Sequence, residues 1–408
     1  MGGISGVNAA LHSIERIMIP EQIIRLVPSA LKLLGCWALV LCGVQIGWSQ
    51  TGELHGQASA WIGAHLQPST GSEAGLRYIP DFLLEQQLGD KLNLNLELSL
   101  NAFGTAQYAK NESALYDLNV KPYRGWLRLS TDRFEARIGL QKINFGSASM
   151  LRPLMWFDRI DPRDPLQLTD GVYAVLGRYY FQNNANLWLW GLYGNNDTKG
   201  WELAATENKT VEYGGRIQSP LWTGEVGLTY HHRRADLNTM LSASTGYAGL
   251  NVPEDRYGVD GKWDIGIGVW FEGALIHQQS ELFGMTYQRQ WTIGTDYTFA
   301  VGNGVSAAME YFQSEYPAGE FTSAAGHGLS ALSLTYSMGV VDQLSAMFYR
   351  DWHNKEWYRL ISWHRTYDNW IFYFTGFWNP ENVQLYRPQS GGNAFAGTGF
   401  QLMVVFNH

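Results

Sequence analysis

Lys91 to Phe103 read KLNLNLELSLNAF, a segment in which leucines and polar residues alternate. Leucine occupies positions 92, 94, 96, 98 and 100, while Asn, Asn, Glu, Ser and Asn occupy positions 93, 95, 97, 99 and 101. Successive side chains of a β-strand point to opposite faces, so the segment predicts a strand with one apolar and one polar face. Its length suits a strand that crosses a bilayer, and the same alternation recurs along the chain.

The composition agrees with such strands. Apolar residues make up 45% of the chain, charged residues only 16% and aromatic residues 14%, with 17 Trp, 22 Tyr and 45 Gly. The mean hydropathy is nevertheless only −0.20, as expected when strands face lipid on one side and water on the other. Because open strand edges are not tolerated in hydrocarbon, the sequence predicts an all-β, closed transmembrane antiparallel β-barrel.

The first 49 residues have the features of a secretory signal peptide. Two basic residues, Arg25 and Lys32, precede an apolar run over 33–44, and the small residues at 47 and 49 suit cleavage before Gln50. We therefore predict a signal peptide over 1–49, with Met18 as an alternative start and an N-terminal membrane anchor as the competing interpretation. Both cysteines of the chain, at 36 and 42, fall inside this segment, which leaves the exported part without thiol chemistry.

Turn signals divide residues 50–408, predicted as one domain, into eighteen strands, with sixteen as the alternative count. Tight turns are expected on the periplasmic side, and mostly longer, polar connections on the extracellular side. The tight turns are predicted at 89–90, 131–132, 183–184, 219–220, 264–266, 302–303, 339–341 and 367–368. A β-propeller would also have many strands, but no blade signature recurs at a fixed period.

The C-terminal segment Gly399–Phe406 alternates into an aromatic residue and resembles the signal that the barrel-assembly machinery reads in outer-membrane proteins. Aromatic residues also cluster near predicted strand ends, as interfacial girdles do. We assign Trp188 and Trp190 to such a girdle. The alternative is that these two residues and Trp270 face the lumen as stacking platforms for sugars.

The polar faces of the predicted strands carry charged residues that we expect to line the lumen. The basic candidates lie on early strands, and acidic candidates lie further round the wall, an arrangement that would set a field across a pore. These pore-lining candidates are Arg124, Arg128, Arg137, Arg178, Glu225, Glu272, Asp296 and Glu310. The alternative is that they are ordinary solvated residues paired with one another.

The connection over 145–170 reads FGSASMLRPLMWFDRIDPRDPLQLTD and combines prolines and charges with an apolar cluster at 154–157. An exposed loop gains nothing from such a cluster, so we predict that this loop folds into the lumen as a pore-constricting segment. Its constriction candidates are Arg152, Asp158, Arg159, Asp161, Arg163 and Asp164. Calcium binding by the aspartates is disfavoured, because the ligand spacing of a calcium loop is absent.

One segment resembles a known family. Arg137–Gly146 reads RIGLQKINFG and is followed by DPRD at 161–164. This is similar to the strand and loop of alginate-export-type and related bacterial porins, in which an R-x-G-x-Q strand leads into an acidic, proline-containing constriction loop. The resemblance implies an arginine-bearing pore through which polar or anionic saccharides diffuse.

These observations lead to two functional hypotheses. The first is an outer-membrane porin that allows passive diffusion of small polar solutes, saccharides or anions among them. The second is a polysaccharide export or capsule-anchoring barrel of the Gram-negative envelope. We find no enzymatic or nucleotide-binding motif in 50–408, expect no cofactor and no metal, and interpret the pair at 231–232 as part of a solvated rim. The net charge of −9 over 50–408 argues against nucleic-acid binding, while homo-oligomer formation stays open.

Overall fold

The structure is a computed structural model that describes residues 50–66, 71–108, 115–238, 251–279, 286–320, 322–381, 385 and 395–408. The predicted signal peptide over 1–49, with its two cysteines and the alternative start at Met18, lies outside these residues. Parts of the longer connections that we predict on the extracellular side also lie outside the described residues. These connections are predicted at 66–74, 104–120, 235–252, 281–287, 317–327 and 379–394. Within the described ranges, no helix combines the length and the apolar character that a membrane span requires.

The described residues form one continuous antiparallel sheet. Its strands are β1 Gln50–His65, β2 Ser72–Leu88, β3 Leu92–Tyr108, β4 Leu115–Ser130, β5 Phe134–Gln141, β6 Val172–Tyr180, β7 Asn186–Tyr193, β8 Ala205–Thr206, β9 Val211–Leu221, β10 Gly224–Asp236, β11 Asn251–Asp264, β12 Gly268–Gln278, β13 Tyr287–Phe299, β14 Val305–Glu315, β15 Gly326–Ser337, β16 Asp342–Asp351, β17 Glu356–Thr366, β18 Trp370–Trp378 and β19 Thr398–Asn407.

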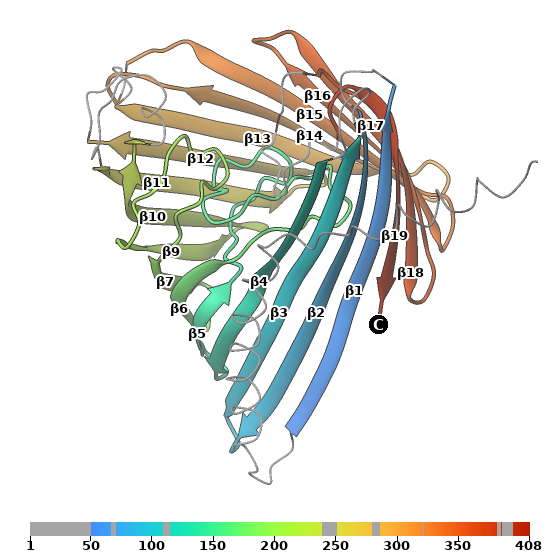
Figure 1. The fold of residues 1–408 in the computed structure, drawn as a ribbon. Helices are drawn as coiled ribbons and strands as arrows, with labels where there is room; N and C mark the ends of the chain where they lie inside the picture. The colour runs from blue at the N-terminus through green and yellow to red at the C-terminus, as the bar shows by residue number, and fades with distance from the viewer. Residues whose placement is uncertain are drawn as a thin grey trace, which may run out of the picture. The chain divides into compact units, whose positions relative to one another are not determined.

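The sheet closes on itself because its last strand pairs with its first. β19 pairs with β1 from Gln57 opposite Asn407 to His65 opposite Gly399, and it also pairs with β18. Neighbours in sequence are otherwise neighbours in the wall, as Figure 1 shows. Apart from the two-residue β8, which pairs only with the end of β10, the described chain has eighteen strands. The prediction of an all-β, eighteen-stranded barrel is therefore confirmed, and the count of sixteen is wrong.

Seven of the eight predicted tight turns lie where one strand gives way to the next, but the turn predicted near 219–220 lies further along the chain. β9 continues through Ser219 and Pro220, which lie opposite Val226 and Glu225 of β10. The chain reverses instead at 222–223, where Trp222 has a φ of 56°. Proline lacks a backbone N–H and usually ends a strand, yet a position close to the strand end accommodates it.

The two faces of the wall differ as the alternation predicts. On β3, the polar side chains of Asn95, Ser99 and Asn101 are buried on the inner side, whereas Leu100 is exposed on the outside. The same division holds on β10, where Thr229 is buried and Leu228 is exposed. An apolar outer face and a polar inner face are what a barrel in a bilayer requires.

The predicted aromatic girdle is partly wrong. Several aromatic side chains at strand ends are exposed on the outside, among them Trp357, Trp370 and Trp378. However, Trp190 and Trp270 are only 4% exposed and lie inside the barrel under the connection between β5 and β6. They are therefore neither girdle residues nor open stacking platforms. The prediction failed because the alternation of side chains along a strand does not show which distant segment covers its inner face.

Candidate functional site

The connection between β5 and β6, residues 142–171, packs against the inner wall of the barrel. Its first part reaches side chains of β11, β12, β13 and β14, far from the two strands that it joins. Ser147 donates a hydrogen bond to Asp260 of β11, and Thr292 of β13 donates one to the carbonyl oxygen of Leu151. The segment thus lies against the inner side of strands that follow it by more than 100 positions in sequence.

Two fully buried glutamates anchor the loop. Glu310 of β14 accepts hydrogen bonds from the backbone N–H groups of Ser149 at 2.7 Å, Met150 at 3.0 Å and Leu151 at 2.6 Å. Glu272 of β12 accepts from the N–H of Ala148 at 2.9 Å and from that of Leu154. Both carboxylates are 0% exposed. Hydrogen bonds to a charged acceptor are the strong ones, so these groups fix the loop to the wall.

The anchor also depends on a glycine. Gly146 has a φ of 100°, a region that residues with a side chain rarely adopt. A β-carbon at this position would contact the carboxylate of Glu272, so the loop backbone can approach the carboxylate only because position 146 has no side chain.

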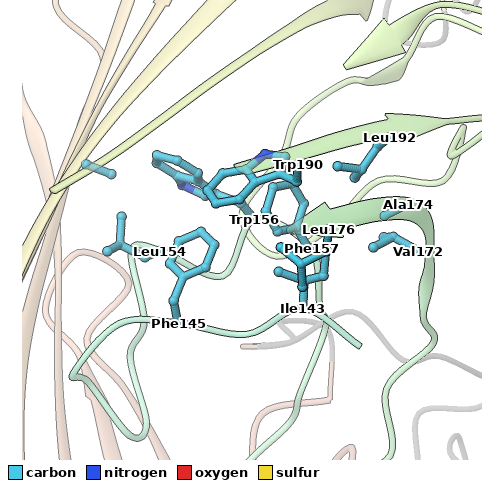
Figure 2. Packing of buried hydrophobic residues seen from close by; sticks show 11 residues of the cluster. Ile143, Phe145, Leu154, Trp156, Phe157, Val172, Ala174, Leu176, Trp190 and Leu192 are labelled. Atoms are coloured by element: carbon cyan, nitrogen blue, oxygen red, sulfur yellow. The ribbon is translucent and has the colours of Figure 1, made fainter. Parts of the chain in front are cut away.

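Apolar side chains hold the loop on two sides of the interior. Phe145, Trp156 and Phe157 pack against Trp190 of β7 and against β6, and Figure 2 shows these rings beside one another. Further along the wall, Met150 and Leu151 pack with residues of β14, β15, β16 and β17. The loop therefore contacts both β6–β7 and β14–β17, which burial of apolar area favours.

The charges of the loop are largely paired within it. Arg152 and Asp158 form an ion pair of 3.0 Å and are 7% and 2% exposed. Burial opposes the charge of Arg152, but the carboxylates of Asp158, Glu272 and Glu310 outweigh burial and raise its pKa. Arg163 donates to both oxygens of the Asp161 carboxylate, at 3.0 to 3.2 Å from Nε and 2.8 Å from Nη2.

The last part of the loop returns to the early strands. Lys121 of β4 lies 2.7 Å from Asp170, and Arg124 donates to the carbonyl oxygen of Thr169 at 3.0 Å. Arg159 lies 4.0 Å from the same Asp170 carboxylate. Burial raises the pKa of Asp164, which accepts a hydrogen bond from the N–H of Leu166 at 3.0 Å. The loop thus connects the basic strands with the acidic anchors of β12 and β14.

The four predicted wall arginines lie on the inner side of β4, β5 and β6, all partly buried. Arg137 lies over the ring of Trp126 at 4.5 Å, and Arg178 lies over the ring of Trp188 at 3.8 Å. Both guanidinium groups share Glu135, at 2.9 and 3.7 Å. Aromatic faces and a shared carboxylate therefore hold these two arginines in place.

The predicted acidic candidates have different surroundings from those expected. Glu272 and Glu310 were expected to line the lumen, but the loop covers both completely. The reason is that their carboxylates accept the loop's backbone N–H groups, contacts that alternation along a strand cannot indicate. Glu225 and Asp296 are on the inner side as expected, the former exposed and the latter half-buried.

A second charged cluster was missed by the sequence analysis. Arg233 lies 2.6 Å from Glu254, and Arg256 lies 2.7 Å from Glu202, which belongs to the connection between β7 and β9. All four side chains are buried. The interpretation of positions 231–232 as part of a solvated rim is wrong for His231, which is buried like Arg233, because this second connection covers β10 and β11 from the inside.

His231 has a defined role in this second cluster. Trp190 donates from its indole nitrogen to Nδ1 of His231 at 3.2 Å, and Nε2 lies 3.2 Å from the carboxylate of Glu212. These partners assign the proton of the neutral ring to Nε2. Among the described residues, no group of three or more His, Cys, Asp or Glu side chains is arranged to hold a metal ion.

No family model matches the sequence, and no curated protein matches it either. Solved structures, however, match the fold of this chain. OccD3 (OpdP) of Pseudomonas aeruginosa aligns with a TM-score of 0.56 at 10% identity, over 88% of this chain and 92% of that chain. OccAB1 of Acinetobacter baumannii aligns with a TM-score of 0.51 at 10% identity, over 88% and 95%.

An anion-selective porin from Comamonas acidovorans aligns with a TM-score of 0.44 at 11% identity, over 88% of this chain and 100% of that chain. At such identities, structural similarity establishes the fold alone. The apolar outer face and the closed wall fit a location in the bacterial outer membrane. The chain therefore has the closed, eighteen-stranded β-barrel fold of the bacterial outer-membrane porins, which confirms the predicted resemblance at the level of the fold.

Proposed function

We propose that the chain is a non-enzymatic outer-membrane channel through which small polar solutes diffuse, and that the loop over 145–170 sets the width of its pore. The observation that carries this proposal is the anchoring of the loop by Glu272 and Glu310. Two buried carboxylates that bind consecutive backbone N–H groups hold a segment at a fixed position inside the barrel, as a constriction requires.

The arginines of β4, β5 and β6 give the proposed pore a preference for anions. Arg124, Arg128 and Arg137 lie on neighbouring strands of the inner wall and are not fully covered by the loop. Glu135 of β5 and Glu97 of the adjacent β3 neutralise part of this charge, so we expect a moderate preference. The acids expected on the opposite wall, Glu272 and Glu310, are buried under the loop and contribute less to the field at the solute path.

Single-channel recording in a planar bilayer tests this function. The purified chain should give discrete conductance steps, and its reversal potential under a KCl gradient should indicate an anion preference. Replacing Arg124, Arg128 and Arg137 together with Gln should shift the reversal potential toward cations. A control in which exposed Arg234 is replaced with Gln should leave it unchanged, because Arg234 is paired with Glu207 at the end of β10. An unchanged reversal potential in the triple variant would show that these arginines do not face the solute path.

The alternative is a polysaccharide export or capsule-anchoring barrel with a closed lumen. It has some support, because the loop contacts β6–β7 and β14–β17 and so extends far into the interior. A folded, heat-modifiable barrel that gives no conductance steps would favour this alternative.

A further inference from the structure

A cavity of about 300 Å³ lies between the anchored loop and the inner side of β13–β17. Met155 and Arg159 of the loop line it, together with Trp201 of the connection between β7 and β9. Its volume is at the lower end of the range for small-molecule sites in proteins. The cavity is separate from the arginines of β4, β5 and β6 described above.

Three of the lining residues have buried polar atoms that lack a hydrogen-bond partner in the described part of the chain. They are the amide oxygen of Gln290, the hydroxyl of Ser314 and the phenol hydroxyl of Tyr358. These side chains are 3%, 7% and 1% exposed. Buried polar groups are nearly always paired, so three unpaired groups at one cavity indicate that something binds there.

The register of the sheet brings two of these groups together. Gln290 of β13 lies directly opposite Ser314 of β14, and Ser314 lies opposite His327 of β15. Side chains at such positions have β-carbons about 5 Å apart. The amide oxygen and the hydroxyl are therefore close enough for one ligand molecule to contact both.

The charged groups at the cavity already have partners. Asp351 accepts from the backbone N–H groups of His353 and Asn354 at 2.9 Å and lies 3.1 Å from the ring nitrogen of His327. Arg159 lies 4.0 Å from Asp170. The unused hydrogen-bonding capacity therefore belongs to neutral groups, one acceptor and two hydroxyls, and this favours a neutral ligand with several hydroxyl groups.

The rest of the lining is apolar. Trp201 stacks on Phe312 with ring centroids 4.9 Å apart, and Leu329 and Leu385 complete this side. A saccharide ring presents C–H groups on its faces and hydroxyl groups at its edge, so it matches an apolar surface beside neutral polar groups. We propose that this cavity is a binding subsite for a neutral saccharide. The proposal rests on the channel function above and names one class of solute for it.

Calorimetric titration of the full chain in detergent with maltose, a neutral disaccharide, tests the proposal. The variant Ser314→Ala/Tyr358→Phe removes two hydroxyls and keeps the shape of the cavity. Since each neutral hydrogen bond contributes several-fold to affinity, we expect maltose to bind about tenfold more weakly to this variant. The matched control Ser333→Ala/Tyr336→Phe removes the same groups from β15 outside the cavity and should bind maltose like the wild type.

A second measurement separates binding from folding. The two hydroxyls have no hydrogen-bond partner among the residues that the structure describes, so their removal should not lower the urea midpoint of unfolding without sugar. Equal maltose affinity in the wild type and in Ser314→Ala/Tyr358→Phe, or no maltose binding to a folded barrel, overturns the proposal and means that the cavity holds water only. If such a barrel still conducts in KCl, the channel function stands and only the subsite fails. A barrel that binds maltose as expected but never conducts contradicts the channel function and supports the subsite.

Discussion

Replacing Glu310 with Gln should release the loop from the wall. In the wild type, Oε1 of Glu310 accepts from the N–H and the hydroxyl of Ser149 and from the indole N–H of Trp270. The other oxygen, Oε2, accepts from the N–H groups of Met150 and Leu151. Glutamine has one oxygen and one NH₂ group, so whichever orientation it takes, at least two donors lose their acceptor and face another donor.

The expected loss follows from these contacts. A hydrogen bond to a charged group contributes about 1.5–3 kcal/mol, so the loss of two corresponds to about 3–6 kcal/mol of docking free energy. At about 1.4 kcal/mol per factor of ten, the opened loop should become on the order of 10²- to 10⁴-fold more populated. Glu272 and the ring cluster around Phe145 still hold part of the loop, so these contacts limit how far the population of the opened loop can rise.

Amide hydrogen exchange of the folded barrel in detergent measures this change. Exchange at Met150 and Leu151 should become faster in Glu310→Gln, while the strand amides of β14 should keep their protection. Glu225→Gln is the matched control, since Glu225 is an exposed carboxylate on the inner side of β10, far along the wall. Unchanged exchange at 149–151 in Glu310→Gln would refute the anchoring role of this carboxylate.

Three further predictions concern the outer face, the loop charges and the inner ion pairs. On β3, Leu96→Arg should lower the free energy of unfolding by about 2–4 kcal/mol because it places a charge toward lipid, whereas Asn93→Arg on the inner side should be tolerated. Equal urea stabilities for the two variants would contradict the assignment of faces. Burial raises the pKa of Asp164, so its protonated form is favoured in the folded loop. This protonation stabilises the folded loop fully below the ordinary Asp pKa of 3.8, and the stabilisation is lost as the pH rises through the raised pKa of the folded loop. Asp164→Asn should therefore flatten the pH dependence of exchange at 160–168, and an identical pH profile in the variant argues against this cause. Arg216 binds both oxygens of buried Asp260, so Arg216→Met should leave an unpaired buried charge and destabilise the barrel by about 3–5 kcal/mol. Adding Asp260→Leu should recover most of that loss in a urea titration. A double variant as unstable as the single one counts against the unpaired charge as the cause.

The alternation of side chains was sufficient to predict the barrel. A period of two is a local property, and it assigned Leu100 to the outside and Asn95 to the inside correctly. Turn residues gave the strand count for the same reason. The error at Ser219 and Pro220 arose because turn preferences do not include the hydrogen bonds that a neighbouring strand supplies.

The inner contacts could not be predicted in the same way. The apolar cluster at 154–157 correctly indicated that the loop is not exposed. However, the contacts of Glu272 and Glu310 with the loop link residues 118 to 161 positions apart, and no local pattern encodes such pairs. The cluster of Arg233, Arg256 and Glu254 was missed for the same reason, since a run of charges at a strand end usually indicates solvent.

The most direct test of the central claim compares the single-channel conductance of residues 50–408 with that of a variant lacking 150–165. The claim is that an anchored inner loop narrows an open barrel. It predicts stable conductance steps for the wild type and larger steps for the shortened chain, with the same heat-modifiable mobility showing that both are folded. Equal conductance of the two chains, or silence from both as folded barrels, would contradict it.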